Sequence, residues 1–261
     1  MIRRLAGGLV LVFVVVSLLA GCGLSGTTSP PAPVAGAVGP LEVFAAASLG
    51  DAFKSEQTGF AASNPGARIT FNFGGSQLLV SQVQQGAPAD VVATADDRTM
   101  QVLADAGLLA SPARVFASNH LAIAVARGNP KGIRALADLA RPGIALVLAA
   151  PTVPVGAYAR QALTAAGVVT SPRSLELDAR AVLQRVSLGE ADAGIVYVTD
   201  ITSASASVEP VLIPSAYDVR AAYPIAVLKA AANPALARAF VAYVLSTEGR
   251  ARLSRFGFGA P

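Results

Sequence analysis

Short runs of apolar residues alternate along this chain with stretches in which apolar residues recur every three or four positions. The short runs are typical of strands buried in a sheet, and the second pattern predicts helices that cover such a sheet. The expected strands are 41–47, 68–73, 90–94, 121–126, 144–149, 194–198 and 225–228. The expected helices are 49–62, 78–85, 97–106, 157–166, 179–188 and 234–246. The alternation predicts an α/β fold with helices on both faces of its sheets.

The apolar residues are numerous enough for a sizeable core. Of 261 residues, 53% are hydrophobic and 14% are charged, which excludes a disordered chain. The length fits two lobes of about a hundred residues each. We expect a first lobe over 41–120, a second lobe over 121–223, and a return of the chain to the first lobe over 224–261.

The first residues follow a different pattern. Arg3 and Arg4 precede an apolar run at 9–20, which is typical of a secretory signal and too short to span a membrane comfortably. We expect this signal to occupy 1–21. Cys22, the only cysteine, follows it in a sequence that resembles the lipobox of bacterial lipoproteins, so lipidation of Cys22 is favoured over a free thiol. The Gly-, Ser-, Thr-, Pro- and Ala-rich segment 22–40 then predicts a tether that holds the protein on the extracytoplasmic, periplasmic face of the membrane.

Several function classes are disfavoured by what the chain lacks. The formal net charge of +4 becomes +2 without Arg3 and Arg4, and no Lys/Arg cluster or tryptophan suggests nucleic-acid binding. One histidine, His120, together with a lipidated cysteine cannot supply an ordinary zinc site. There is no G-x-S-x-G turn, Walker A motif or G-x-G-x-x-G motif, so a hydrolase of that type or a nucleotide enzyme is not indicated. We expect His120 to be an ordinary residue at a strand start.

Small hydroxyl residues and glycines gather where expected strands pass into helices. These junctions contain Ser48, Ser76 after Gly74 and Gly75, the segment 151–157, Asp178 with Ala179, and Tyr197. Each has a structural interpretation, since serines cap helices, glycines make turns and a tyrosine fills a core. However, the carboxyl ends of parallel strands meet at one edge of a sheet, and helix N-termini there offer unpaired N–H groups to an anion.

The same junctions carry a family resemblance. The segments 43–49, 86–90, 153–156 and 194–197, together with 255–258, resemble in order and spacing the molybdate-binding proteins of ABC importers. The resemblance covers nearly the whole chain after the tether. It implies a type II periplasmic substrate-binding fold with two Rossmann-like lobes joined by a hinge. It also implies a monomer that binds molybdate or tungstate and delivers it to an ABC permease, without catalysis and without a cofactor.

The resemblance further implies the residues that hold the oxyanion. Ser48 and Ser76 would each give a hydroxyl and a backbone N–H, Val155 and Ala179 a backbone N–H, and Tyr197 its hydroxyl. Molybdenum would be bound only as its oxyanion. Gly74 and Gly75 stand where serines are frequent in that family, which affects the expected width of the pocket. The alternatives are a receptor for another tetrahedral oxyanion such as sulfate or thiosulfate, a serine-dependent lipoprotein hydrolase using Ser48 or Ser76, or a structural lipoprotein.

Overall fold

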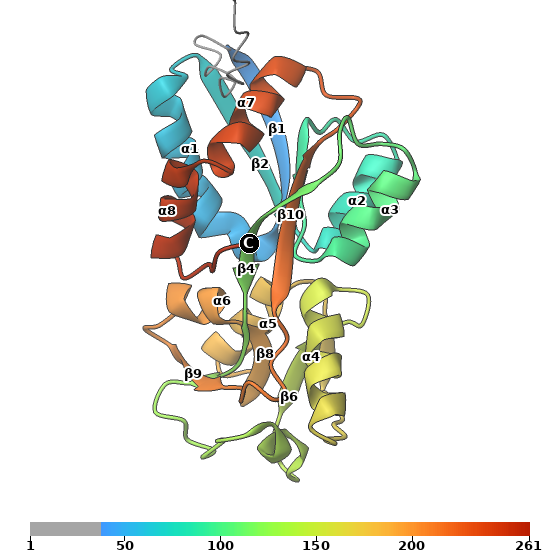
Figure 1. Cartoon of the computed structure of the whole chain (residues 1–261). Coiled ribbons are helices and arrows are strands. Elements are labelled where there is room, and N and C mark those ends of the chain that lie inside the picture. Colours follow the sequence, from blue (N-terminus) through green and yellow to red (C-terminus); the bar gives the residue numbers. More distant parts are fainter. Residues whose placement is uncertain (1–37) are drawn as a thin grey trace, which may run out of the picture. The chain divides into compact units, whose positions relative to one another are not determined.

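The computed structural model describes residues 38–261, and Figure 1 traces them in sequence order. The expected signal 1–21, Cys22 and most of the expected tether 22–40 lie outside the described residues. In the described part of the chain, no helix combines the length and the apolar character needed to cross a membrane.

The first sheet has five strands in the order β2-β1-β3-β10-β4. The strands are β1 (Gly39–Ala46), β2 (Ala67–Gly74), β3 (Val91–Ala93), β4 (Arg114–Asn119) and β10 (Ala221–Val227). β1 is parallel to both β2 and β3, with Val43 opposite Phe71 on one side and Val91 on the other. β10 is antiparallel to both β3 and β4, so the sheet is mixed.

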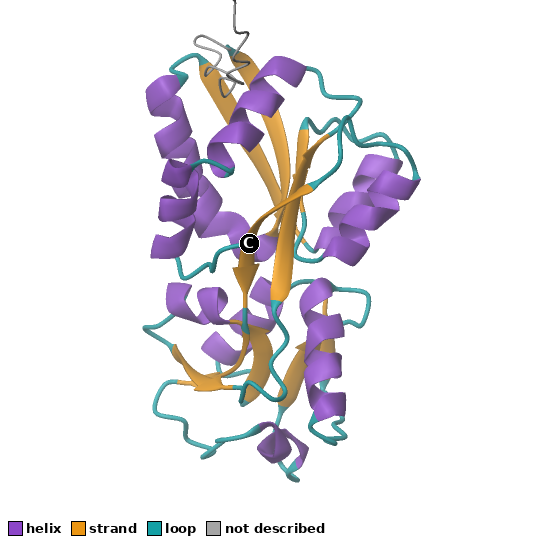
Figure 2. Ribbon diagram, in the orientation of Figure 1, coloured by secondary structure: helices purple, strands orange, loops and turns teal. Residues whose placement is uncertain are grey.

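Alternate residues of these strands pack into two separate apolar layers. Phe44 and Val92 belong to the layer under α2 and α3, whereas Val43 and Val91 belong to the layer under α1 and α7. The period-2 alternation of a strand places neighbouring side chains on opposite faces, and apolar residues at every position therefore require helices on both sides. Figure 2 shows helices on both sides of this sheet. They are α1 (Gly50–Ser63), α2 (Ser76–Gln84), α3 (Asp97–Asp105), α7 (Pro234–Val244) and α8 (Thr247–Arg255).

The second sheet also has five strands, in the order β7-β6-β8-β5-β9. They are β5 (Leu121–Ala126), β6 (Leu146–Ala149), β7 (Ser174–Glu176), β8 (Ala193–Tyr197) and β9 (Val208–Leu212). Its helices are α4 (Pro154–Ala165), α5 (Ala179–Ser187) and α6 (Val198–Ser203). β6 is parallel to β7 and β8, while β5 is antiparallel to β8 and β9. A Cβ on Gly194 would come within 2.5 Å of Val182, so this glycine lets α5 approach β8 closely.

The chain passes between the two sheets beside β4 and β10, which are paired and lie side by side in Figure 1. β4 ends at Asn119 and β5 begins at Leu121, so His120 alone separates a strand of one sheet from a strand of the other. The return segment enters β10 at Ala221, whereas the sequence pattern places the return at 224. A hinge between the lobes would lie at these two neighbouring segments, the one between β4 and β5 and the one that enters β10.

The α/β class with helices on both faces of the sheets is confirmed. Three features differ from the sequence expectation. The sheets are mixed, not parallel, because β10 and β5 run against their neighbours. β1 begins at Gly39, inside the expected tether 22–40, because Gly39 and Pro40 already pair with β2. β4, β7, β9, α6 and α8 were not expected from the sequence.

Candidate functional site

One small cavity is formed where strand ends of both sheets meet helix starts. It is lined by the ends of β1, β2 and β8 and by the first residues of α2, α4 and α5. The lining residues are Ala46, Ala47, Ser48, Gly74, Gly75, Ser76, Ala95, Val153, Pro154, Val155, Asp178, Ala179 and Tyr197. The structure therefore brings together all the residues that the sequence nominated: Ser48, Ser76, Val155, Ala179 and Tyr197.

The size of the cavity limits what it can hold. Its volume is about 10 Å³, whereas pockets for drug-sized ligands are roughly 300 Å³ or more. A peptide, a sugar or a nucleotide would not fit without a large separation of the walls. The cavity suits only a compact ligand of a few atoms.

Neither serine caps the helix start at which it lies. Ser48 lies in the 3₁₀ turn Ala47–Leu49 that leads into α1, and within the described chain no side chain caps α1 or α2. The Ser76 hydroxyl instead accepts a hydrogen bond from the backbone N–H of Ala95 at 3.0 Å. The Ser48 hydroxyl lies 3.0 Å from the hydroxyl of Tyr223. Both serines are buried. The oxygen of Ser76 accepts from Ala95, which leaves the Ser76 proton for the cavity, whereas either hydroxyl of the Ser48–Tyr223 pair can be the donor.

Backbone donors come from the first turns of three helices. Ser76 and Ala179 are the first residues of α2 and α5, and Val155 is the second residue of α4. N–H groups at these positions have no partner inside their own helix, and the helix dipole adds about half a positive charge at each N-terminus. A Cβ on Gly156 would lie 2.1 Å from the carbonyl oxygen of Ala150, so only glycine lets the start of α4 pack this closely. The cavity thus receives several convergent N–H groups.

Tyr197 is the last residue of β8 and is 1% exposed. Its hydroxyl is buried and has no hydrogen-bond partner among residues 38–261. Burial raises the pKa of the Tyr197 phenol well above its usual value, and the nearby Tyr223 adds to this shift, so the group stays a protonated donor. A buried hydroxyl without a hydrogen-bond partner lowers the stability of the fold, and a ligand that accepts its hydrogen bond would remove that cost.

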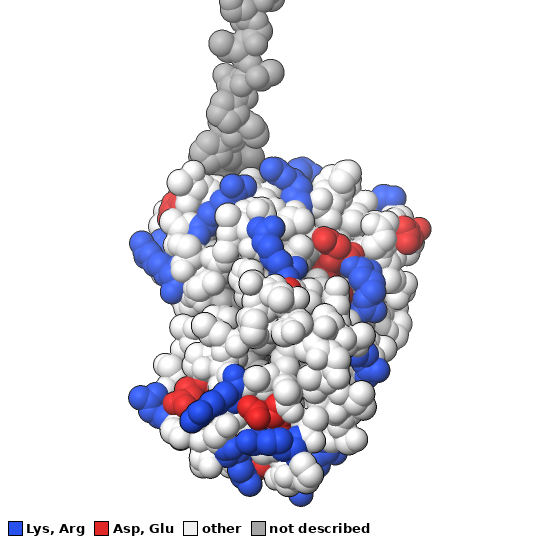
Figure 3. All heavy atoms as spheres, turned by 60° about the horizontal axis from the view of Figure 1, so that its bottom comes forward, with Lys and Arg blue, Asp and Glu red and all other residues white. Residues whose placement is uncertain are grey.

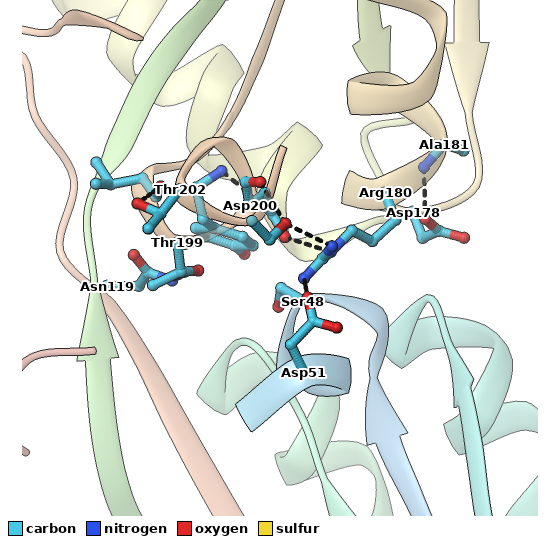
Figure 4. Close-up of polar contacts among 12 residues, drawn as sticks. Ser48, Asp51, Asn119, Asp178, Arg180, Ala181, Thr199, Asp200 and Thr202 are labelled. Carbon is cyan, nitrogen blue, oxygen red and sulfur yellow. Dashed lines mark hydrogen bonds and ion pairs between the residues drawn. The ribbon is translucent and has the colours of Figure 1, made fainter. Parts of the chain in front are cut away.

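The charged groups nearest to the cavity are engaged elsewhere. Asp178 accepts the backbone N–H of Ala181 at 2.8 Å and therefore caps α5, as expected for this position. Arg180 does not line the cavity, and its guanidinium lies between two carboxylates, 2.9 Å from Asp200 and 2.8 Å from Asp51 (Figure 4). Burial raises the pKa of Asp200, and the Arg180 guanidinium opposes that rise. No lysine or arginine of the described chain lines the cavity.

Contacts between the two lobes surround the cavity. Gln77, beside Ser76 on α2, donates to the carbonyl oxygen of Leu177 at 2.9 Å. Arg98 on α3 donates to the carbonyl oxygen of Thr152 at 3.0 Å. With the ion pair between Arg180 and Asp51, these contacts join the lobes around the site.

Sequence reasoning missed the residues behind the cavity wall. Tyr223 and Asn119 are buried in β10 and β4, where Tyr223 reads as an ordinary core residue and Asn119 has no recognisable motif. Arg180 is an unremarkable helix residue until its two carboxylate partners are known. His120 does not line the cavity, and its Nδ1 lies 2.6 Å from Asp218. The serines consequently have no histidine base beside them within the described residues.

The surface adds little that points to another function. On the face shown in Figure 3, basic and acidic side chains lie toward the two ends and an uncharged belt crosses the middle. Residues 38–261 contain no group of three or more histidine, cysteine, aspartate or glutamate residues that could hold a metal ion.

The chain is similar to known solute-binding proteins over almost its full length. The family described as bacterial extracellular solute-binding proteins matches residues 41–259. The molybdate-binding protein ModA of Mycobacterium tuberculosis is 46% identical over 257 residues, covering 98% of each chain.

Two solved structures have a similar fold. The periplasmic molybdate-binding protein of Azotobacter vinelandii matches with a TM-score of 0.71 at 20% identity, over 85% of this chain and 99% of that one. The sulfate-binding protein SubI from Mycobacterium tuberculosis matches with a TM-score of 0.76 at 20% identity, over 84% of this chain and 86% of that one. At this level of identity both structures support the fold and leave the ligand open.

Proposed function

Since the chain belongs to the bacterial extracellular solute-binding proteins and, within them, to the molybdate-binding ModA family, we propose that it captures molybdate outside the cytoplasm for an ABC importer. The proposed ligand groups are the hydroxyls of Ser48, Ser76 and Tyr197 and the backbone N–H groups of Ser48, Ser76, Val155 and Ala179. No catalytic step and no cofactor is part of this proposal.

The observation that carries the proposal is the chemistry of the cavity wall. Uncharged donors converge there from both lobes, and the buried hydroxyl of Tyr197 has no other partner in the described chain. A tetrahedral oxyanion without protons offers only acceptors, so donors and acceptors match completely. Helix N-termini supply the favourable potential that lysine or arginine would supply at other anion sites.

The same wall gives a basis for selectivity. Phosphate near neutral pH carries a proton that needs a buried acceptor, and leaving such a group unpaired costs about 1 to 3 kcal/mol. Sulfate has no such proton and must be rejected by size, because its oxygens lie closer to the central atom than those of molybdate. Tungstate has nearly the dimensions of molybdate, and we propose that it binds as well.

The experiment that tests this function is a titration of the purified protein with molybdate, tungstate, sulfate and phosphate by isothermal calorimetry. We expect molybdate and tungstate to bind tightly, sulfate weakly and phosphate least. Thermal unfolding should shift upward with molybdate concentration, as it does for a ligand that binds only the folded state. Preferential binding of sulfate or thiosulfate would establish the alternative receptor, and failure of every anion to bind would refute an oxyanion receptor.

The location is the second part of the proposal. We propose that Cys22 is lipidated and becomes the N-terminus when the signal 1–21 is removed, and that the protein, as a monomer, meets its permease from the outer face of the membrane. Mass spectrometry of the mature N-terminus should find an acylated Cys22, and Cys22→Ser should release the protein from the membrane fraction. Membrane retention of that variant would contradict the anchor without affecting the binding function.

The hydrolase alternative receives no support from the geometry. Ser48 and Ser76 are held by Tyr223 and a backbone N–H, and no histidine of the described chain lines the cavity. A nucleophilic serine needs a base within hydrogen-bond reach. A panel of ester and phosphoester substrates should therefore give no turnover.

A further inference from the structure

A chain of buried polar contacts leads from the hinge region to the candidate site. Asn119, the last residue of β4, donates through Nδ2 to the Tyr223 hydroxyl at 3.4 Å and to Thr199 Oγ1 at 2.8 Å. The Tyr223 hydroxyl lies 3.0 Å from Ser48 Oγ, which faces the cavity. Asn119, Tyr223 and Ser48 are all less than 5% exposed. Figure 4 shows Asn119 and Thr199 together, with Ser48 between them and Arg180.

The donor of each hydrogen bond in this series of contacts can be inferred from the first one, between His120 and Asn119. The backbone N–H of His120 donates to Asn119 Oδ1 at 3.0 Å, and a backbone N–H can only donate. The amide oxygen of Asn119 must therefore face His120. Its NH₂ group, which can only donate, must then face the hydroxyls of Tyr223 and Thr199.

The same reasoning assigns the donor in the hydrogen bond between Tyr223 and Ser48. Tyr223 accepts from Asn119, which leaves its own proton for another acceptor, and we assign that proton to Ser48 Oγ, 3.0 Å away. Burial raises the pKa of the Tyr223 phenol, which keeps that proton in place. Ser48 Oγ thus accepts from Tyr223 and has its single proton left for the cavity. Ser76 is fixed in the same sense, because its oxygen accepts from Ala95 N–H.

We propose that Asn119 and Tyr223 are positioning residues that hold Ser48 as a donor and thereby make the site reject oxyanions that carry a proton. This inference rests on the proposed function and deepens it by assigning the selectivity to residues that do not touch the ligand. A hydroxyl is free in principle to accept or to donate. Without the fixed chain, Ser48 would turn and accept the proton of hydrogenphosphate.

The sharpest test reverses the chain with a substitution of nearly equal shape. In Asn119→Asp the carboxylate can still accept the N–H of His120, but it only accepts, so it draws the Tyr223 proton away from Ser48. Ser48 then lacks its donor and can accept from a ligand. Tyr223→Phe removes the same donor without adding a charge and serves as the second variant.

The measurement is the ratio of sulfate affinity to phosphate affinity, obtained by calorimetry or by competition against molybdate at mildly alkaline pH. Sulfate and hydrogenphosphate are then dianions of similar size that differ by one proton. The added negative charge of Asn119→Asp lowers the affinity for both anions alike, so a change in the ratio of the two affinities comes from the proton of hydrogenphosphate. We expect this ratio to fall by roughly fivefold to a hundredfold in Asn119→Asp and in the same direction in Tyr223→Phe. The control is Thr199→Val, which removes the other partner of Asn119 and should leave the ratio unchanged.

The outcomes separate the inference from the function beneath it. A lowered ratio in either of the two test variants, with an unchanged ratio in Thr199→Val, supports the inference. If Asn119→Asp and Tyr223→Phe fold, still bind an oxyanion and show the wild-type ratio of sulfate affinity to phosphate affinity, the inference is overturned and the proposed function stands. If the wild-type protein binds none of these anions, the proposed function fails and the inference fails with it. Should Asn119→Asp not fold, Tyr223→Phe alone decides.

Discussion

The substitution Tyr197→Phe should change ligand affinity and stability in opposite directions. Tyr197 is 1% exposed, and its hydroxyl has no hydrogen-bond partner among residues 38–261. Its ring packs edge-on against Tyr223 at a centroid distance of 5.7 Å, and phenylalanine preserves that packing. The change therefore removes one buried hydroxyl at the candidate site and preserves the ring packing.

The two magnitudes follow from the state of that hydroxyl. A hydrogen bond to a charged acceptor contributes about 1.5 to 3 kcal/mol, so the dissociation constant for molybdate should rise roughly 10- to 150-fold. Without ligand, the hydroxyl is buried and unpaired, which costs about 1 to 3 kcal/mol. The free energy of unfolding without ligand should therefore stay equal to that of the wild type or rise by up to this amount.

Calorimetry with molybdate and denaturant unfolding without ligand measure the two effects separately. Tyr243→Phe is a suitable control, because Tyr243 bonds Glu248 at 3.1 Å on the α7–α8 side of the first lobe and should leave affinity unchanged. Loss of more than about 1 kcal/mol of stability in Tyr197→Phe with unchanged affinity would mean that the hydroxyl serves the fold. The assignment of Tyr197 as a ligand group would then be wrong.

Further predictions concern the groups around the site and one buried carboxylate. Gly156→Ala should abolish tight binding, because the new Cβ would lie 2.1 Å from a carbonyl oxygen and displace the start of α4 that carries Val155. Gly50→Ala, which has open space around its Cβ, is the matched control. Equal effects of the two substitutions on calorimetric affinity would argue against a requirement for close packing at Gly156. Asp178→Ala should lower the unfolding free energy by about 1 kcal/mol through loss of the α5 cap, with little effect on affinity, and a large gain in molybdate affinity would show that its charge opposes the ligand. Glu56 is fully buried with both carboxylate oxygens unpaired in the described chain, and burial raises its pKa from 4.5 to about 8. Between pH 4.5 and about 8 the folded state therefore holds a proton that the unfolded chain releases, so the free energy of unfolding should fall as pH rises through this range. Glu56→Gln should reduce the dependence of thermal unfolding on pH in the same range. An unchanged pH dependence in this variant would refute the assignment to Glu56.

The elements that the sequence predicted are mainly the central strands and the helices beside them. β1, β3, β8 and β10 lie inside their sheets, and their continuous apolar runs signal burial on both faces. The strands that were not expected, β4, β7 and β9, are all edge strands. One side of an edge strand is unpaired, so its sequence needs no apolar run, and β9 even contains Pro210. Local pattern was therefore most informative where burial forced it, and β2 is the one edge strand of the described chain that was expected.

The two serines show where local reasoning about the site stops. Their position before helices made capping the simplest interpretation, yet the structure gives them other partners, Tyr223 for Ser48 and Ala95 for Ser76. Tyr223 is 175 residues from Ser48 and Ala95 is 19 residues from Ser76, so both partners lie beyond the few neighbouring residues that a capping pattern covers. Asp178 does cap α5, and its partner is only three residues away, within the range of a local pattern.

The sequence by itself determined which junctions carry hydroxyls, glycines and helix starts, because strand and helix periodicity and N-terminal signals are encoded over a few neighbouring residues. It also carried the family pattern that joins these junctions into one proposed site. Only the tertiary structure decided that β10 and β5 run antiparallel, that Arg180 is held by Asp51 and Asp200, and that the Tyr223 hydroxyl lies 3.0 Å from the Ser48 hydroxyl. These features depend on contacts between residues that the fold brings together from different elements, and a hydrogen bond has a direction only once both of its partners are in place.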